Sequence, residues 1–184
     1  MLALSTRFRP GDRIALARPG YVAYRNTLRA LHMQPVEVAC GPETRFQLTA
    51  AQLAALDPAP AGVIIASPAN PTGTIIPDAE LAAIAEVCRA RGVAIVSDEI
   101  YHGLSYVGPT ASMLQFAPDA FVINSFSKYW SMAGWRLGWL LAPPEQVAAA
   151  RAYIGNMFLT PPSLSQHAGL CLLYTSPRPT RQEA

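Results

Sequence analysis

The chain has 184 residues, of which 51% are hydrophobic and 14% are charged, and its formal net charge is +2. This composition is typical of a globular domain with a sizeable core, and it excludes a disordered, highly charged protein. The small net charge and the lack of an apolar run of ~18 residues lead us to expect neither a nucleic-acid partner nor a membrane partner.

The first segment, which starts at Met1, reads as the end of a helix just before the turn Pro10-Gly11-Asp12. Its charges, Arg7 and Arg9, follow a very short apolar run, whereas a signal peptide has its charges first and a longer apolar segment. The cysteines are odd in number and far apart, so they form neither a disulfide framework nor a metal-ligand pattern. They are Cys40, Cys88 and Cys171. We expect reduced, buried thiols, no metal site, and a cytoplasmic protein.

Short apolar runs alternate with helical patterns through the rest of the chain. The predicted strands are Arg13–Arg18, Val36–Ala39, Val63–Ser67, Val93–Ser97, Phe121–Ser125 and Leu137–Ala142. The predicted helices are Tyr21–Met33, Thr49–Leu56, Pro77–Arg91, Pro144–Gly155 and Ser163–Leu173. Strands that are apolar throughout are typical of a sheet covered on both faces. The alternation therefore predicts an α/β fold with a mainly parallel central sheet and helices on both faces, incomplete at both ends.

The last residues differ in character from the rest of the chain. Pro177 and Pro179 end the last predicted helix, and no apolar periodicity follows Leu173. We therefore expect residues 1–173 to form part of one domain. We expect residues 174–184 to be a disordered tail, or a tail that is not native to this fold.

The most informative segment, Ser125–Gly138, follows a predicted strand. Lys128 lies just past the strand end, where open α/β sheets bind ligands, and an amine there can form an imine with an aldehyde cofactor. Arg136 offers a planar fork suited to a phosphate, and the hydroxyls of Ser125 and Ser127 can donate to the same group. The alternative is an exposed lysine and a structural arginine in a connecting loop.

A second segment, Ser97–Tyr101, ends another predicted strand. The carboxylate of Asp98 can pair with a protonated ring nitrogen and hold it cationic. Tyr101 can reach a ring hydroxyl from the same side, whereas Glu99 is expected to point elsewhere because neighbouring side chains alternate in direction. A strand-terminal aspartate also serves as a helix cap or a metal ligand, so Asp98 alone is weak evidence for a cofactor site. His102 follows directly, and a packing role is favoured over a place in the site.

Two further segments also follow strand ends. Ser67–Gly73 contains Asn70, whose amide can donate to a ligand oxygen, although Asn-Pro and Thr-Gly also indicate a simple turn. Arg18–Arg25 contains Tyr21, which can stack on a flat ring. It also contains Tyr24, which core packing of a helix explains about as well.

Taken together, the four segments resemble the class I and II aminotransferases, a branch of the fold-type I pyridoxal-phosphate enzymes, over nearly the whole chain. Ser125–Gly138 is similar to that family's cofactor-attachment motif in full. The other three motifs follow in the family's order; they are Pro19–Tyr21, Asn70–Gly73 and Asp98–Tyr101. Each motif is moderately specific, and four in order are highly specific.

The resemblance implies a role for each matching residue. Lys128 holds pyridoxal 5′-phosphate as a Schiff base and then carries a proton between the substrate α-carbon and cofactor C4′. Asp98 pairs with the pyridine nitrogen, and Tyr21 stacks on the ring. The resemblance assigns the ring's 3′-oxygen to Asn70 and Tyr101, and the phosphate to Ser125, Ser127 and Arg136.

Three parts of the family's site have no counterpart in this sequence. They are a glycine- and serine-rich phosphate loop, the arginine for the substrate carboxylate, and the segment that reaches the neighbouring subunit's phosphate. The chain therefore resembles most of the large, cofactor-binding domain. The resemblance implies a homodimeric full-length parent that acts on an amino acid and a 2-keto acid. We expect the 184-residue chain alone to be inactive or nearly so.

Three alternatives remain open. Relatives with similar motifs act as pyridoxal-phosphate-dependent lyases or synthases, including those that break carbon–sulfur bonds. A transcription regulator can carry an aminotransferase-like domain as a ligand sensor, with a DNA-binding segment upstream. The third alternative is a truncated, non-functional product. Sequence upstream of this chain would separate an enzyme from a regulator.

Overall fold

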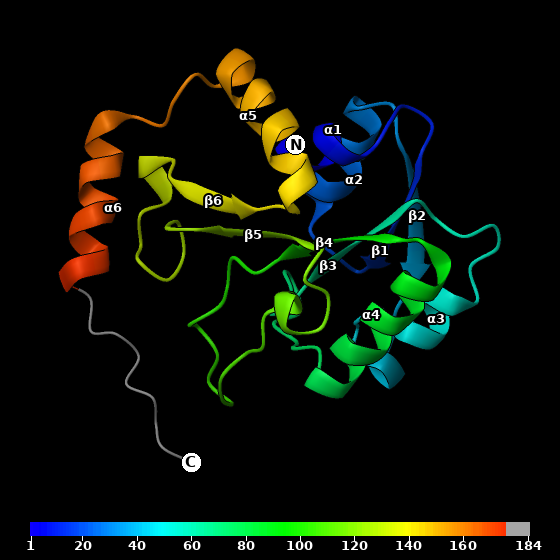
Figure 1. The fold of residues 1–184 in the computed structure, drawn as a ribbon. Coiled ribbons are helices and arrows are strands. Elements are labelled where there is room, and N and C mark those ends of the chain that lie inside the picture. Colours follow the sequence, from blue (N-terminus) through cyan, green and yellow to red (C-terminus); the bar gives the residue numbers. More distant parts are fainter. Residues whose placement is uncertain (176–184) are drawn as a thin grey trace.

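A six-stranded sheet forms the centre of residues 1–175, the part of the chain that this computed structural model describes (Figure 1). The strands lie in the order β2-β1-β3-β4-β5-β6. β1 to β5 run parallel to one another, and β6 pairs antiparallel with β5. The strands are β1 (Arg13–Arg18), β2 (Gln34–Ala39), β3 (Gly62–Ala66), β4 (Ala94–Asp98), β5 (Phe121–Ser125) and β6 (Gly138–Leu141).

Helices connect the strands and cover the sheet. The α-helices are α1 (Leu2–Arg7), α2 (Val22–Ala30), α3 (Ala50–Ala54), α4 (Asp78–Arg91), α5 (Pro144–Met157) and α6 (Ser163–Thr175). Short 3-10 helices occur at η1 (Pro42–Thr44), η2 (Met113–Gln115) and η3 (Ala133–Trp135). No helix within residues 1–175 combines the length and the apolar character that crossing a membrane requires.

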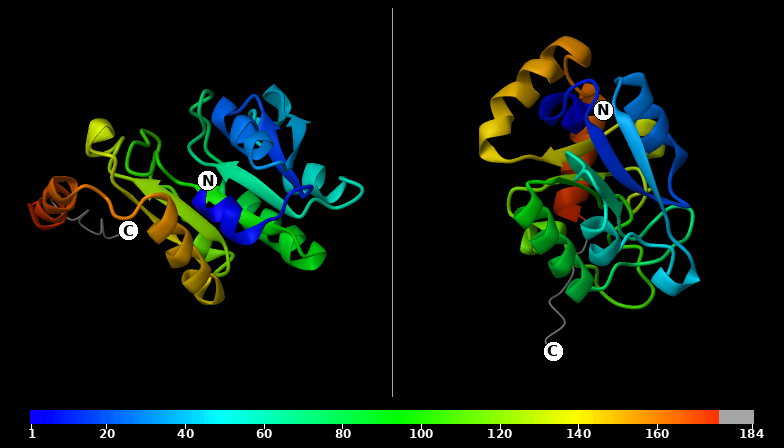
Figure 2. Two further views of the ribbon diagram at one scale, coloured as in Figure 1. Left: turned by 90° about the horizontal axis from the view of Figure 1, so that it is seen from above. Right: turned by 90° about the vertical axis from the view of Figure 1, so that its right-hand side faces the viewer.

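Alternate residues of the central strands pack on opposite faces of the sheet. Val63 and Ile95 belong to the core beneath α3 and α4, whereas the next residues, Ile64 and Val96, pack with α1 and α2. All four side chains are buried. Figure 2 shows helices on both sides of the sheet, and α5 lies beside α1. Because strand side chains alternate in direction, a sheet covered on both faces needs strands that are apolar throughout.

The predicted α/β fold with a mainly parallel sheet is confirmed, with small shifts at the element ends. β2 begins at Gln34, earlier than the predicted start at Val36. Pro35 makes this start hard to predict from the sequence, because proline has no backbone N–H to donate to a neighbouring strand. Within residues 1–175, β2 tolerates this proline because the strand lies at an edge of the sheet and pairs with β1 alone. α6 ends at Thr175, slightly later than predicted. The rest of the expected tail, residues 176–184, lies outside the described residues.

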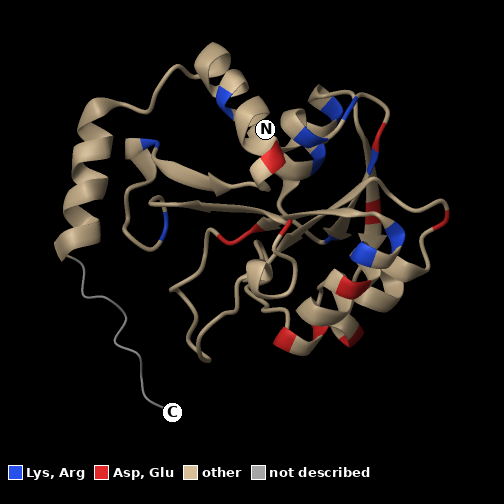
Figure 3. Cartoon of the chain, in the orientation of Figure 1, with Lys and Arg blue, Asp and Glu red and all other residues tan. Residues whose placement is uncertain are grey.

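α4 begins and ends where its charges predict. Asp78 and Glu80 lie in its first turn, and Arg89 and Arg91 lie in its last. Figure 3 shows acidic residues at one end of this helix and basic residues at the other. These signs oppose the partial charges of the helix ends. Gly92 follows with a φ of 66°, a left-handed conformation that favours glycine and ends the helix.

The guanidinium of Arg91 ties α4 to α3. It donates hydrogen bonds of 2.7 to 2.8 Å to the carbonyl oxygens of Leu53, Ala54 and Leu56. Carbonyls at the end of a helix have no donor within the helix, so Arg91 supplies one.

We expect Arg91→Met to lower the free energy of unfolding by about 1–3 kcal/mol, because the three carbonyls lose a charged donor. Urea denaturation measures this change. Arg29→Met is the matched control, since Arg29 is exposed on α2, and its effect should stay within about 0.5 kcal/mol. Equal losses in the two variants would show that Arg91 does not join the helices.

Candidate functional site

The carboxyl ends of β3, β4 and β5 lie side by side at one edge of the sheet. The register pairs Ala66 with Asp98, and Asp98 with Ile123. The segments that leave these strands therefore enter one region, as ligand-binding loops do in open α/β sheets. Each segment carries a predicted site residue: Asn70 after β3, Tyr101 after β4 and Lys128 after β5.

Asp98 is the last residue of β4, and its carboxylate is partly buried with two donors. The Tyr24 hydroxyl donates to Oδ2 at 2.6 Å, and the Ile100 amide donates to Oδ1 at 3.2 Å. Burial raises the pKa of Asp98, and these two hydrogen bonds oppose that rise. A tyrosine hydroxyl is protonated at neutral pH, and burial and the neighbouring Asp98 charge raise the pKa of Tyr24 further above its ordinary value. Tyr24 therefore stabilises an anion at the strand end.

Asn70, Tyr101 and Lys128 come together beside Asp98's strand. The Asn70 amide nitrogen lies 3.5 Å from the Tyr101 hydroxyl, and both side chains are partly buried. The Lys128 Nζ lies 5.8 Å from the centroid of the Tyr101 ring, within the range of a cation–π contact. Lys128 is exposed, and it is the only lysine in the chain. The arrangement offers an amide, a hydroxyl and an amine to one ligand.

Tyr21 immediately precedes α2 at the same edge. Its side chain is 45% exposed, and its ring meets the Tyr24 ring edge to face, with centroids 5.5 Å apart. A shallow pocket of about 20 Å³ is lined by Tyr21, Tyr24 and Asn70. A larger pocket of about 400 Å³ also has Asn70 in its lining, together with Tyr101. Asn70 therefore contributes to both pockets.

The remaining predicted residues occupy the turn between β5 and β6. The hydroxyls of Ser125 and Ser127 lie 2.7 Å apart, and Ser125 also donates to the Leu137 carbonyl at 3.0 Å. Arg136 is exposed, with a left-handed φ of 52°, and its Nη1 donates to the Ala133 carbonyl at 2.9 Å. Within the described residues, no hydrogen bond or ion pair joins Arg136 to Lys128 or Asp98. The two serines thus meet, whereas Arg136 is held within its own turn.

Sequence reasoning missed the part that Tyr24 plays. Core packing of a helix explains Tyr24 equally well from the sequence, but its hydroxyl is the closest hydrogen-bond partner of Asp98 in the described residues. The available signal was its position one helical turn after Tyr21, on the helix that follows β1 at the same sheet edge. The expectation that Glu99 points elsewhere is confirmed. Its carboxylate is buried and bonded to Ser97, to Ser112 and to the Met113 amide.

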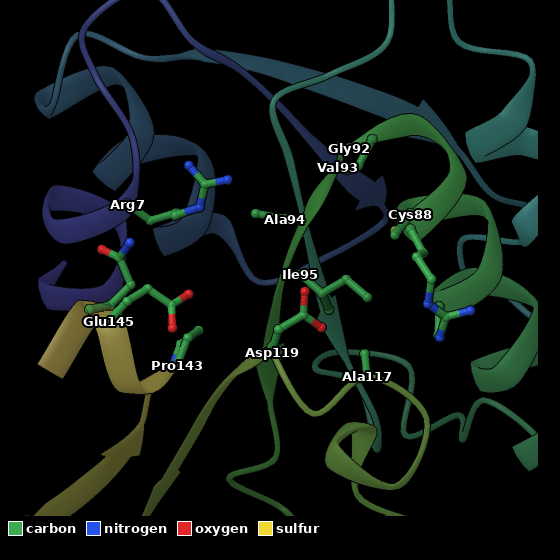
Figure 4. Close-up of a pocket in the computed structure, with 13 residues that line it drawn as sticks. Arg7, Cys88, Gly92, Val93, Ala94, Ile95, Ala117, Asp119, Pro143 and Glu145 are labelled. Atoms are coloured by element: carbon green, nitrogen blue, oxygen red, sulfur yellow. The ribbon is translucent and has the colours of Figure 1, made fainter.

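A separate pocket of about 230 Å³ lies at the opposite edge of the sheet (Figure 4). It is bounded by α4 on one side and by α1 and α5 on the other, with Arg7, Asp119 and Glu145 among its lining residues. Cys88 also lines it, and burial raises the pKa of this thiol to about 12. None of the predicted site residues reaches this pocket. Within residues 1–175, no cluster of His, Cys, Asp and Glu has an arrangement suited to a metal ion.

We expect Tyr24→Phe to raise the pKa of Asp98, because the variant removes a hydrogen bond that favours the ionised carboxylate while burial stays. On acidification, Asp98 should therefore take up its proton at a higher pH than in the unmodified chain. The titration of the Asp98 carboxyl carbon by NMR measures the shift. Tyr153→Phe, on the exposed side of α5, is the control and should leave that titration unchanged. An unchanged midpoint in Tyr24→Phe would contradict the assignment.

Comparison with known proteins places these residues in one family. Residues 1–178 match the family described as aminotransferase class I and II. The chain is 54% identical over 172 residues to the valine–pyruvate aminotransferase of Mycobacterium tuberculosis, covering 92% of this chain and 44% of that protein. It is 36% identical over 174 residues to the aspartate aminotransferase of Geobacillus stearothermophilus, covering 91% and 44%. The chain thus spans less than half the length of these relatives.

Solved structures agree with the sequence match. A crystal structure of an aminotransferase from Mycobacterium tuberculosis superposes with a TM-score of 0.91 at 53% identity, covering 93% of this chain and 45% of that one. The aspartate aminotransferase of Thermus thermophilus, solved with maleate, superposes with a TM-score of 0.89 at 30% identity, covering 94% and 46%. The sheet order and helix placement described above are therefore those of aminotransferase structures.

Proposed function

Because this chain belongs to the class I and II aminotransferase family, we propose that it is the cofactor-binding part of a pyridoxal-phosphate-dependent aminotransferase. The observation that carries the proposal is the meeting of Asn70, Tyr101 and Lys128 beside Asp98 at the carboxyl edge of the sheet. Residues 1–173 would be part of the large domain of a longer polypeptide, which we call the full-length protein.

The chemistry of the side chains fits a phosphorylated pyridine aldehyde. Asp98 offers a carboxylate whose charge Tyr24 supports, which suits a protonated ring nitrogen. Asn70 and Tyr101 offer an amide and a hydroxyl for the 3′-oxygen, and the exposed ring of Tyr21 offers a surface for stacking. The proposed phosphate donors are Ser125, Ser127 and Arg136.

Lys128 is the proposed attachment residue for the cofactor aldehyde. An arginine cannot serve, since its guanidinium stays protonated in proteins. Every other basic side chain in the sequence apart from histidine is an arginine. The one lysine of the sequence therefore lies at the proposed attachment position, just past the end of β5.

The bound cofactor supplies an electron sink that stabilises negative charge at the substrate α-carbon. With the cofactor bound, Asp98 would keep its ring nitrogen protonated, and Asn70 and Tyr101 would orient the ring. The Nζ of Lys128 would accept the proton of the substrate α-carbon and donate it again during the transfer. A positioned acid–base group of this kind accelerates proton transfer by about 10²–10⁴-fold.

The proposed substrates are an amino acid donor and a 2-keto acid acceptor. The relative named valine–pyruvate aminotransferase, 54% identical to this chain, supports this class of substrate. We place the full-length protein in the cytoplasm as a homodimer. The 184-residue chain alone should have little or no activity, because it lacks a counterpart of the family's substrate-carboxylate arginine.

A panel of amino donors tests the proposal. With a 2-keto acid acceptor, the full-length protein should form a new amino acid and a new keto acid in equal amounts, and the 184-residue chain should form neither. Release of ammonia or sulfide without amino-group transfer would favour a lyase. Cofactor binding without turnover, in a protein that also binds DNA, would favour a regulator. Full activity of the 184-residue chain would contradict its assignment as a part.

A further inference from the structure

His102 connects two of the loops that carry the proposed site. Its Nε2 lies 3.0 Å from the carbonyl oxygen of Ser67, the first residue of the segment that carries Asn70. His102 itself directly follows Tyr101. Because a carbonyl oxygen only accepts hydrogen bonds, Nε2 must donate the proton in this contact. The ring therefore joins the segment after β3 to the segment after β4.

Glu99 holds the ring of His102 from the other side. The Glu99 Oε2 lies 3.4 Å from His102 Nδ1, and both side chains are largely buried. The other oxygen, Oε1, accepts from Ser97, Ser112 and the Met113 amide at 2.8 to 3.1 Å. These donors fix the carboxylate with Oε2 beside the ring. A His102 protonated on both nitrogens donates to Oε2 and to the Ser67 carbonyl at once, which orients the imidazole.

The segment after β3 is internally braced. The Ala69 amide donates to Thr74 at 3.0 Å, and the Ile76 amide donates to the Ser67 hydroxyl at 3.0 Å. On its far side, the Gln47 amide donates to the Thr74 carbonyl at 2.8 Å. These bonds hold the segment together, and its contact with His102 joins it to the segment after β4.

The spacing between Asn70 and Tyr101 needs such a support. Their direct contact is 3.5 Å long, at the outer limit for a hydrogen bond, so it holds the two side chains only weakly. The His102 contact with Ser67 is shorter at 3.0 Å.

We propose that His102, oriented by Glu99, is a positioning residue that sets the distance between Asn70 and Tyr101 for their shared contact with the cofactor's 3′-oxygen. The inference rests on the proposed function, because it concerns the same site. His102 touches neither substrate nor cofactor in this account. It acts through the backbone of Ser67 and through its chain neighbour Tyr101. If the separation of the two donors changes by a few tenths of an ångström, they can no longer both bond one acceptor oxygen with good geometry, and binding of that oxygen weakens.

The experiment measures pyridoxal phosphate affinity in the full-length protein by titration of its absorbance, with His102→Gln and His102→Asn as a matched pair. A glutamine amide can reach the place of Nε2 and keep the bond to Ser67, whereas an asparagine amide reaches only the place of Nδ1. We expect roughly tenfold weaker binding in His102→Asn and an affinity within about twofold of the unmodified protein in His102→Gln. Equal affinities in the two variants would overturn the inference.

A double variant tests whether His102 acts through Asn70. In an Asn70→Ala background, His102→Asn should weaken binding by less than about twofold further, because the positioned group is already gone. The same tenfold loss in both backgrounds would mean that His102 affects binding by another route. Amide exchange at Ile76 in the cofactor-free protein should speed up in His102→Asn only. If the unmodified protein itself binds no pyridoxal phosphate, the proposed function fails rather than this inference.

Discussion

Lys128→Ala is expected to abolish covalent attachment of pyridoxal phosphate and to lower transamination by the full-length protein by at least about 10²–10⁴-fold. The variant removes the only lysine amine in the chain and with it the group proposed to move the α-proton. Borohydride reduction followed by peptide mass analysis measures the attachment, and an amino-transfer assay measures the rate.

Lys128→Arg is the informative companion to this variant. It keeps the positive charge beside Tyr101 but cannot form the covalent bond, so it should lose attachment as completely as the alanine variant. Attachment at the N-terminal amine or at a lysine outside this chain, with Lys128→Ala fully active, would contradict the assignment.

Asp98→Ala is expected to weaken pyridoxal phosphate binding by roughly 10- to 100-fold, because a charge-assisted hydrogen bond contributes about 1.5–3 kcal/mol. Removal of the α-proton should slow as well, because an unprotonated ring withdraws electrons less strongly. Exchange of the substrate α-proton for deuterium, followed by NMR, measures the second effect.

Asp119→Ala is the matched control for Asp98→Ala. Asp119 is an exposed aspartate that lines the pocket at the opposite edge of the sheet, so its loss should change neither affinity nor exchange. Comparable losses in both variants would indicate a general effect of charge rather than a contact at the ring nitrogen. Asp98→Asn should fall closer to Asp98→Ala than to the unmodified protein, since an amide keeps the shape but not the charge.

The core and its strands were predictable because they depend on how apolar residues are spaced along each short segment of the sequence. A strand such as β3, with Val63 on one face and Ile64 on the other, needs apolar residues throughout when helices cover both faces. The gathering of Asn70, Asp98 and Lys128 at one edge of the sheet was also predictable, since each stands at or just past a strand end. Parallel strands place such positions at one edge of the sheet.

Contacts between distant segments were not predictable from local pattern. Tyr24 and Asp98 are 74 residues apart, and the sequence around Tyr24 fits helix packing equally well. The contact between His102 and Ser67 likewise depends on how two loops meet in space. The placement of Arg136 depends on left-handed backbone at Ser131 and at Arg136 itself, within the turn that reverses the chain into β6. Neither residue type signals that conformation.

The central proposal is that one molecule of pyridoxal phosphate would contact the amine of Lys128, the carboxylate of Asp98 and the guanidinium of Arg136. A crystal structure of the full-length protein grown with the cofactor tests it most directly. The account predicts a covalent link at Lys128 Nζ, the ring nitrogen within hydrogen-bond distance of Asp98, and the phosphate against the turn of Ser125, Ser127 and Arg136. A cofactor bound elsewhere, or one whose ring nitrogen faces away from Asp98, would contradict it.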